Sequence, residues 1–305
     1  MSETMNNTVN ENMNRDLTPD DEKRIGRGPF ADVLHRLSKS PLAMFGLLFI
    51  IFLVFLAVFA DVLAPYNFAE QDLEHMFELP SKEFWLGTDG FGRDIMSRLI
   101  YGARVSLQVG FIAVGIALVI GGLLGAVAGF YDGWIDNAIM RIMDVLLAVP
   151  QTLLAIAIAA SLGPGLYNLM IAVGISAVPN YARIVRGSVL SIRGMEFVEA
   201  ARAVGSSDLR IILKHIIPNS MAPIIVQSTL GVASAILNAA GLSFIGLGIQ
   251  PPYPEWGAML SGGRQYIRDF PHMTLYPGLA IMLTILALNF LGDGLRDALD
   301  PKLKR

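Results

Sequence analysis

Residues 199 to 218 read EAARAVGSSDLRIILKHIIP and lie between two long apolar runs. The spacing of their apolar residues predicts two short amphipathic helices, because these residues recur at i, i+3, i+4 and i+7. The apolar stripes consist of Phe197, Ala200, Ala201 and Val204 in the first helix, and of Leu209, Ile212, Leu213 and Ile216 in the second. Gly205 lies between the helices, where a helix end favours a residue in the left-handed conformation.

The ends of the second helix carry recognisable signals. Ser206 or Ser207 can cap it, and Asp208 in its first turn suits the positive end of the helix dipole. Pro218 is expected to end the helix just before the next apolar run. A helix pair hinged at a glycine, between two hydrophobic spans, is a shape that another protein can bind.

The composition indicates a membrane protein with many spans. Of the 305 residues, 53% are hydrophobic and only 16% are charged. The formal net charge of −3 gives no indication of a nucleic-acid partner. The chain has no cysteine, which excludes disulfides and thiolate metal sites. Its four histidines are scattered, so no metal cofactor is expected on this chain.

Uncharged runs predict six transmembrane helices in an all-α protein. The uncharged run 145–182 is too long for one span, and Gly163-Pro164-Gly165 divides it into spans three and four. A short turn carrying Asp132, Asp136, Arg141 and Asp144 is expected after span two. The other predicted spans are residues 41–60, 105–131, about 222–247 and about 274–292.

Three glycines in the second predicted span, Gly121, Gly125 and Gly129, recur every four residues. Such a stripe of small residues lets another helix approach closely. The stripe fits a packing seam within the chain and a contact with another subunit equally well.

Lysine and arginine counts orient the predicted spans. The segments on the side of residues 199 to 218, both chain ends included, hold 17 of them, and those on the other side hold 6. The positive-inside rule therefore places both termini and this segment in the cytoplasm.

The predicted spans hold a few polar residues and no charged residue near their middle. Such residues either join helices or line a wet pathway, and Gln227, Thr229 and Asn238 are the candidates for a pathway. A secondary transporter usually needs intramembrane charges. The chain also has no GxxxxGK[ST], HExxH or GxSxG motif, so a partner must supply the energy.

The stretch GTDGFGRD, residues 87–94, combines glycines with Asp89, Arg93 and Asp94. These residue types would suit a metal or phosphate site. We favour a turn-rich extracytoplasmic cap held by Asp–Arg contacts.

Residues 199 to 218 resemble the EAA loop of the membrane subunits of ABC importers, with Ile217 in place of the usual leucine before the proline. The resemblance extends from about residue 36 to the end of the chain. LGTDGFGRDIMSRLIYGARVSL, GLSFIGLGIQPPYPEWGAML and NFLGDGLRDALDPKLKR are similar to segments of C-type permease subunits of dipeptide and oligopeptide importers. Asn238 stands where many relatives carry an acidic residue, which removes an intramembrane charge.

The resemblance implies a type I ABC importer permease fold with cytoplasmic EAA coupling helices, in the inner membrane. Composition, the uncharged runs and the resemblance together divide the chain into a disordered cytoplasmic tail 1–35, a first span with an extracytoplasmic segment 36–104, a permease domain 105–295 with the EAA loop 194–218, and a cytoplasmic tail 296–305. The residues that the resemblance assigns to ATPase coupling are Glu199, Ala200, Ala201, Arg202, Gly205, Asp208 and Pro218.

The resemblance also implies the partners. These are a homologous B-type permease forming a heterodimer, two ATP-binding subunits that carry ATP and Mg, an extracytoplasmic peptide-binding protein and the lipid bilayer. The chain itself would be a non-catalytic subunit importing dipeptides or oligopeptides. Importers of nickel or glutathione share this permease type. An ATP-independent channel or secondary transporter, and a purely structural scaffold subunit, are the alternatives from other classes.

Overall fold

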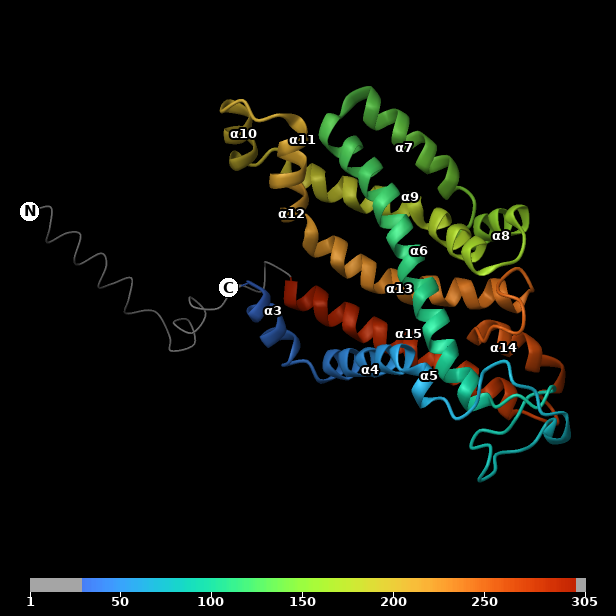
Figure 1. Ribbon diagram of the computed structural model, residues 1–305. Helices are drawn as coiled ribbons and strands as arrows, with labels where there is room; N and C mark the ends of the chain where they lie inside the picture. Colours follow the sequence, from blue (N-terminus) through green and yellow to red (C-terminus); the bar gives the residue numbers. More distant parts are fainter. Residues whose placement is uncertain (1–28, 300–305) are drawn as a thin grey trace, which may run out of the picture.

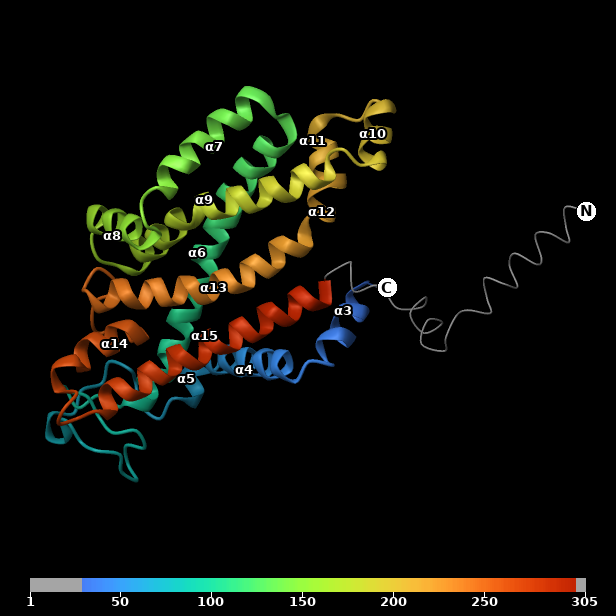
Figure 2. The ribbon, with the colours of Figure 1, turned by 180° about the vertical axis from the view of Figure 1, so that it is seen from behind.

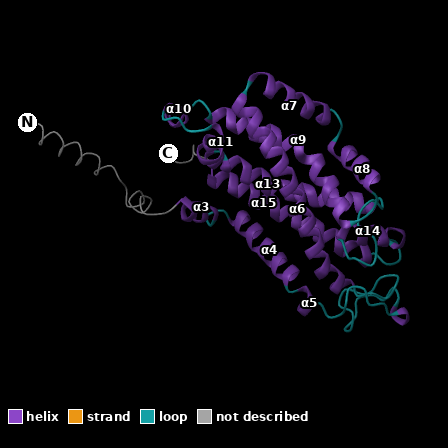
Figure 3. Cartoon of the chain, turned by 45° about the horizontal axis from the view of Figure 1, so that its top comes forward, coloured by secondary structure: helices purple, strands orange, loops and turns teal. Residues whose placement is uncertain are grey.

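The structure is a computed structural model that describes residues 29–299. Helices make up the regular structure of these residues, and the described part contains no strand (Figure 3). In chain order the helices are α3 (Pro29–Leu37), α4 (Pro41–Val58), α5 (Ala60–Leu63), α6 (Ile95–Tyr131), α7 (Gly133–Leu147), α8 (Gln151–Leu162), α9 (Leu166–Ile192), α10 (Glu196–Ala203), α11 (Asp208–Ile211), α12 (Ile217–Asn219), α13 (Met221–Phe244), α14 (Trp256–Gly263) and α15 (His272–Leu299).

The long helices form one bundle that α6 crosses obliquely (Figure 1). Helix α4 packs along α15, and α9, α13 and α15 follow one another across the bundle when it is seen from behind (Figure 2). Helices α3 and α10–α12 and the last turn of α15 lie at one end of the bundle, whereas α14 and the loop before α6 lie at the other (Figure 1). The two ends of the bundle therefore carry different structures.

Five helices are long and apolar enough to cross a membrane, namely α4, α6, α9, α13 and α15. The predicted third span is not one straight helix, because α7 and α8 meet at an angle of 87°. The break falls at Pro150, which has no N–H to continue the helical hydrogen bonds of α7. The expected short turn after span two is also wrong, since its residues form α7.

The predicted terminal boundaries need correction. Residues 29–35, assigned above to a disordered tail, belong to α3, which packs against α15. Helix α15 continues to Leu299, beyond the predicted domain boundary at residue 295. The rest of the predicted tails, residues 1–28 and 300–305, lies outside the described residues.

The glycine stripe of the second predicted span is a packing seam within the chain, between α6 and α9. A Cβ atom at Gly121 would lie 2.5 Å from the carbonyl oxygen of Val178, and one at Gly125 would lie 2.3 Å from that of Ala182. Real Cβ atoms do not approach backbone this closely, so only glycine permits this separation of the helices. The same stripe places Gly129 against Val189 and Arg186.

The loop before α6 is held by the expected Asp–Arg contacts. The Asp89 carboxylate accepts hydrogen bonds from the backbone N–H of Phe91 and from both the backbone N–H and Nε of Arg93, the last at 2.7 Å. Nε of Arg98 lies 3.6 Å from the same carboxylate. Among the described residues, no group of three or more His, Asp or Glu could hold a metal ion.

We predict that Gly125→Val destabilises the protein by about 1–3 kcal/mol or more, because the new side chain overlaps the α9 backbone. The thermal unfolding temperature of the detergent-purified protein measures this effect. Gly122→Val is the matched control on the same helix, since a Cβ there meets only a side-chain atom of Leu118, at 3.8 Å. Equal unfolding temperatures for the two variants would contradict the packing argument.

Candidate functional site

The segment α10–α12, residues 196–219, which we call the hairpin, is seated on the ends of α6 and α9. Its buried apolar residues join one cluster with residues of those two helices and of α13. The hairpin contributes Val198, Ala201, Ile211, Ile212 and Ile216, and the helices contribute Ala126, Phe130, Val185, Val189, Ile192 and Ile224. Because the hairpin packs on these helix ends, a force applied to it reaches both helices directly.

The turn at Gly205 is the predicted left-handed helix end. Gly205 has φ +76°, its N–H donates to the carbonyl of Arg202 at 2.9 Å, and the N–H of Ser206 donates to that of Ala201 at 3.1 Å. These two bonds form a Schellman motif, which satisfies carbonyls that the end of α10 would leave unpaired. Ser207 occupies the N-cap position of α11, as expected, although its side chain makes no capping hydrogen bond.

The predicted helix end at Pro218 is wrong. Residues Ile212–Ile216 form a π-helical segment, and the chain continues through Pro218 into α12 and α13. The N–H of Ile217 reaches the carbonyl of Ile212, five residues earlier. A π-turn beside a proline shifts the hydrogen-bond register, so the missing N–H of Pro218 does not end the helix.

The predicted apolar stripes are only partly the faces that the hairpin buries, since Ala201, Ile212 and Ile216 are buried but other members are exposed. Val204 and Leu209 are exposed, at 81% and 67%, whereas Val198 and Ile211 are fully buried. In the second stripe, Ile211 and Ile216 are both buried at a spacing of five. Ile211 joins the predicted Ile212 on the buried face, and its spacing of five from Ile216 matches the π-helical bonding between them.

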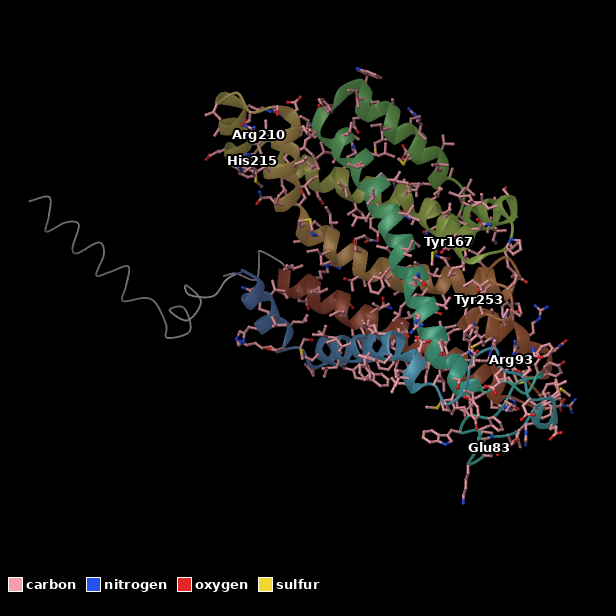
Figure 4. All side chains as sticks on the ribbon, viewed as in Figure 1. Glu83, Arg93, Tyr167, Arg210, His215 and Tyr253 are labelled. Carbon is pink, nitrogen blue, oxygen red and sulfur yellow. The ribbon has the colours of Figure 1, made fainter. Side chains whose placement is uncertain are left out.

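The outer face of the hairpin is left open and is both charged and apolar. Of the seven residues that the resemblance assigns to coupling, six are exposed and Ala201 alone is buried in the seat. The Arg202 guanidinium lies 5.2 Å from the centroid of the Phe130 ring, at the end of α6. Figure 4 shows Arg210 and His215 on this outer part of the molecule. The exposed Val204, Leu209 and Leu213 add an apolar patch among these charges.

Three ion pairs join α9 to α7 and to the turn before it. Arg183 pairs with Asp144 at 2.7 Å, Arg186 pairs through both ends of its guanidinium with Asp136, and Arg193 pairs with Asp132 at 2.7 Å. The hydrogen bond from Arg193 lowers the pKa of Asp132 below its ordinary value. These pairs hold α7 on α9, and the hairpin packs on α9 through the apolar cluster described above.

A polar cavity of about 190 Å³ lies within the bundle, between α6, α8, α9 and α13. Gln151, the first residue of α8, accepts a hydrogen bond at 3.3 Å from the amide nitrogen of Asn180 on α9. The Tyr181 hydroxyl donates to the carbonyl of Gln227 at 3.4 Å. Gly231 and Ser234 continue the wall along α13. The cavity lies at the bend between α7 and α8, where Gln151 enters the bundle.

The structure brings one of the three candidate pathway residues to this cavity. Gln227 lines it, whereas Thr229 and Asn238 do not. At 100° per residue, Asn238 lies on the same face of α13 as Gln227 and Ser234, one turn beyond the cavity, and Thr229 lies on the opposite face. Tyr181 and Ser234 were not among the residues considered from the sequence. Ser234 lies two helical turns after Gln227, and Tyr181 directly follows Asn180. These two positions were the signal that the sequence offered.

The chain matches two family models. Residues 121–305 match the binding-protein-dependent transport system inner membrane component, and residues 28–80 match the N-terminal transmembrane domain of oligopeptide transport permease C. The first match contains the hairpin, the glycine seam and most of the residues that line the polar cavity.

Similar proteins agree with these matches. The chain is 51% identical to the dipeptide transport system permease protein DppC of Alkalihalophilus pseudofirmus, over 94% of each chain. It is 48% identical to the glutathione transport system permease protein GsiD of Escherichia coli O157:H7, over 91% of this chain and 92% of that protein.

A solved structure of the inward-facing MetNI methionine ABC transporter has a similar fold. It matches with a TM-score of 0.56 at 18% identity, covering 68% of this chain and 98% of that one. The chain therefore belongs to the family of inner membrane components of binding-protein-dependent transport systems, the permease subunits of ABC importers.

Proposed function

We propose that this chain imports short peptides as one half of a permease pair, and that the hairpin receives the energy from an ATPase. The observation that carries the proposal is the hairpin itself, which is seated on α6 and α9 and leaves a charged and apolar face open. The family implies ATPase and binding-protein partners in a membrane. The dipeptide substrate is supported by the 51% identity to a dipeptide permease.

The coupling step would use the outer face of the hairpin. Glu199, Arg202 and Asp208 offer charges to an ATPase subunit, and Val204 and Leu209 flank the Gly205 turn as apolar contacts. Closure of an ATPase pair would move the hairpin, and its buried face would carry that motion into α6 and α9. Coupling of this kind requires that the hairpin binds the two ATPase states with different affinity. ATP and Mg would be held by the ATPase subunits.

The pathway would run along the face of α13 that carries Gln227, Ser234 and Asn238. The cavity beside Gln227 is lined by side-chain amides and by the hydroxyls of Tyr181 and Ser234. Polar groups inside a membrane protein are costly unless they are hydrogen-bonded, and the backbone of a passing peptide can supply such bonds. We propose that a homologous B-type permease covers this face and completes the path. Thr229 lies on the opposite face of α13, so it would line the path only if the second permease covered that face instead.

The proposed orientation places the hairpin and both termini in the cytoplasm. It is supported by the lysine and arginine counts and by the common position of α3, the hairpin and the last turn of α15 at one end of the bundle (Figure 1). The loop before α6 and α14 would then face the extracytoplasmic side.

A glutathione importer is the second candidate. It is supported by the 48% identity to GsiD over most of both chains. Glutathione is itself a short peptide, so the same pathway chemistry serves both substrates.

Purification from membranes in mild detergent, followed by identification of the bound proteins, tests the proposed assembly. We expect a second permease, ATPase subunits and a binding protein to copurify. Uptake of radiolabelled dialanine and of glutathione by cells with and without this chain separates the two substrates. Recovery of the chain alone, together with unchanged uptake of both solutes, would contradict the proposal.

Gly205→Val is predicted to abolish peptide uptake while leaving the amount of protein in the membrane unchanged. The cause is the backbone conformation, since a Cβ at Gly205 meets no atom within 4 Å but φ is +76°. Immunoblots of membranes and uptake assays measure the two effects. Gly194→Val is the control, because Gly194 also has an open surrounding and lacks a positive φ. Normal uptake by the Gly205 variant would rule out this hinge.

Gln227→Leu is predicted to lower the rate of peptide uptake at least severalfold, because it removes a polar wall of the cavity. ATPase subunits should still copurify, since Gln227 is not part of the hairpin. Thr229→Val on the opposite face of α13 is the matched control, and Asn238→Leu tests whether the path continues along the helix. Loss of uptake with Thr229→Val and not with Gln227→Leu would place the path on the other face.

A further inference from the structure

A second cavity, of about 270 Å³, lies at the end of the bundle opposite the hairpin. The start of α6, the loop before it and the segments around α14 form its walls. Its lining includes Asp89, Phe91, Arg93, Arg98, Tyr253 and Tyr266. Figure 4 shows Arg93 and Tyr253 at this end of the molecule.

The charges that line this cavity are not balanced. The Asp89 carboxylate is shared by two guanidinium groups, those of Arg93 and Arg98, which are 7% and 5% exposed. The neighbouring buried carboxylate, Asp94, accepts hydrogen bonds from the backbone and hydroxyl of Ser97 and does not line the cavity. The residues that line the cavity therefore carry one more positive than negative charge, which favours binding of an anion.

The arginines also have hydrogen-bond donors to offer. Arg93 donates through Nε to Asp89, and Arg98 donates through one terminal nitrogen to the carbonyls of Phe68 and Pro252. Within residues 29–299, no protein oxygen accepts a hydrogen bond from the terminal nitrogens of Arg93. A guanidinium with free terminal N–H groups matches the two oxygens of a carboxylate.

We infer that this cavity binds an acidic side chain of the extracytoplasmic binding protein when that protein docks. The inference rests on the proposed function, which places this end of the bundle outside the cytoplasm. The cavity shares no lining residue with the polar cavity near Gln227, which favours docking over passage of substrate. Exposed aromatic rings at its rim, Phe91 and Tyr253, are residues enriched in protein interfaces together with arginine.

The test measures the Kd between the purified binding protein and the complete transporter in nanodiscs, with dialanine present, at two salt concentrations. Arg93→Gln is expected to raise this Kd about tenfold or more and to weaken its salt dependence, because one charged partner of a buried contact is lost. The basal ATPase rate without the binding protein should not change. Arg268→Gln is the matched control, since it removes the same charge from an exposed position outside the cavity.

A second variant leaves both arginines in place. Gly262 lines the cavity and a Cβ there meets no atom within 4 Å, so Gly262→Glu should fold and supply its own carboxylate to the arginines. It is expected to weaken docking as Arg93→Gln does. Wild-type affinity in both variants, or equal weakening by Arg268→Gln, would overturn the inference.

Titration of N-acetyl-dialanine into the transporter without binding protein separates a small-molecule site from a docking site. Binding to the wild type that is lost in Arg93→Gln would overturn the docking inference and assign the cavity to a free carboxylate. A wild-type transporter that binds no binding protein would instead refute the proposed function, and the inference with it.

Discussion

The close contact of α6 with α9 is the constraint on which the rest of this structure depends. Gly121 and Gly125 let the two backbones approach to a distance that no side chain would permit. The ends of these same helices then form the seat of the hairpin, through residues such as Phe130 and Val189. A wider separation would open that seat, so the position of the hairpin is a consequence of the glycine seam.

Charged residues and uncharged polar residues occupy different parts of the molecule. Charged residues gather at the two ends of the bundle, in the hairpin with the α7–α9 ion pairs and in the loop before α6. The bundle between them holds amides and hydroxyls around Gln227 and Asn180 but no ion pair among the described residues. A path of this kind can carry a polar solute, and the absence of charge within it is consistent with energy supplied from the hairpin side.

The bend between α7 and α8 connects these regions. Pro150 ends the hydrogen bonding of α7, and Gln151 directly after it enters the polar cavity. Helix α7 is tied to α9 by ion pairs, and α9 leads into the hairpin. Direct contacts thus connect the hairpin to α9, α9 to α7, and α7 to the wall of the cavity. A movement of the hairpin can therefore be transmitted to the cavity through these contacts.

The sequence by itself determined the class of the protein, the positions of the long apolar helices and the left-handed turn at Gly205, because these depend on hydrophobic length and local backbone preference. It did not determine which face of the hairpin is buried. There Ile211 and Ile216, five residues apart across the π-turn, are buried, whereas Leu209 and Leu213 of the predicted apolar stripe are exposed. Only the tertiary structure decided that the glycine seam joins α6 to α9, that the third span is bent, and that Arg93 and Arg98 share one carboxylate. The seam depends on contacts between residues far apart in the chain, such as Gly125 and Ala182, which no local pattern records. The angle of the bend and the sharing of one carboxylate depend on how neighbouring segments pack, which their local sequence does not specify.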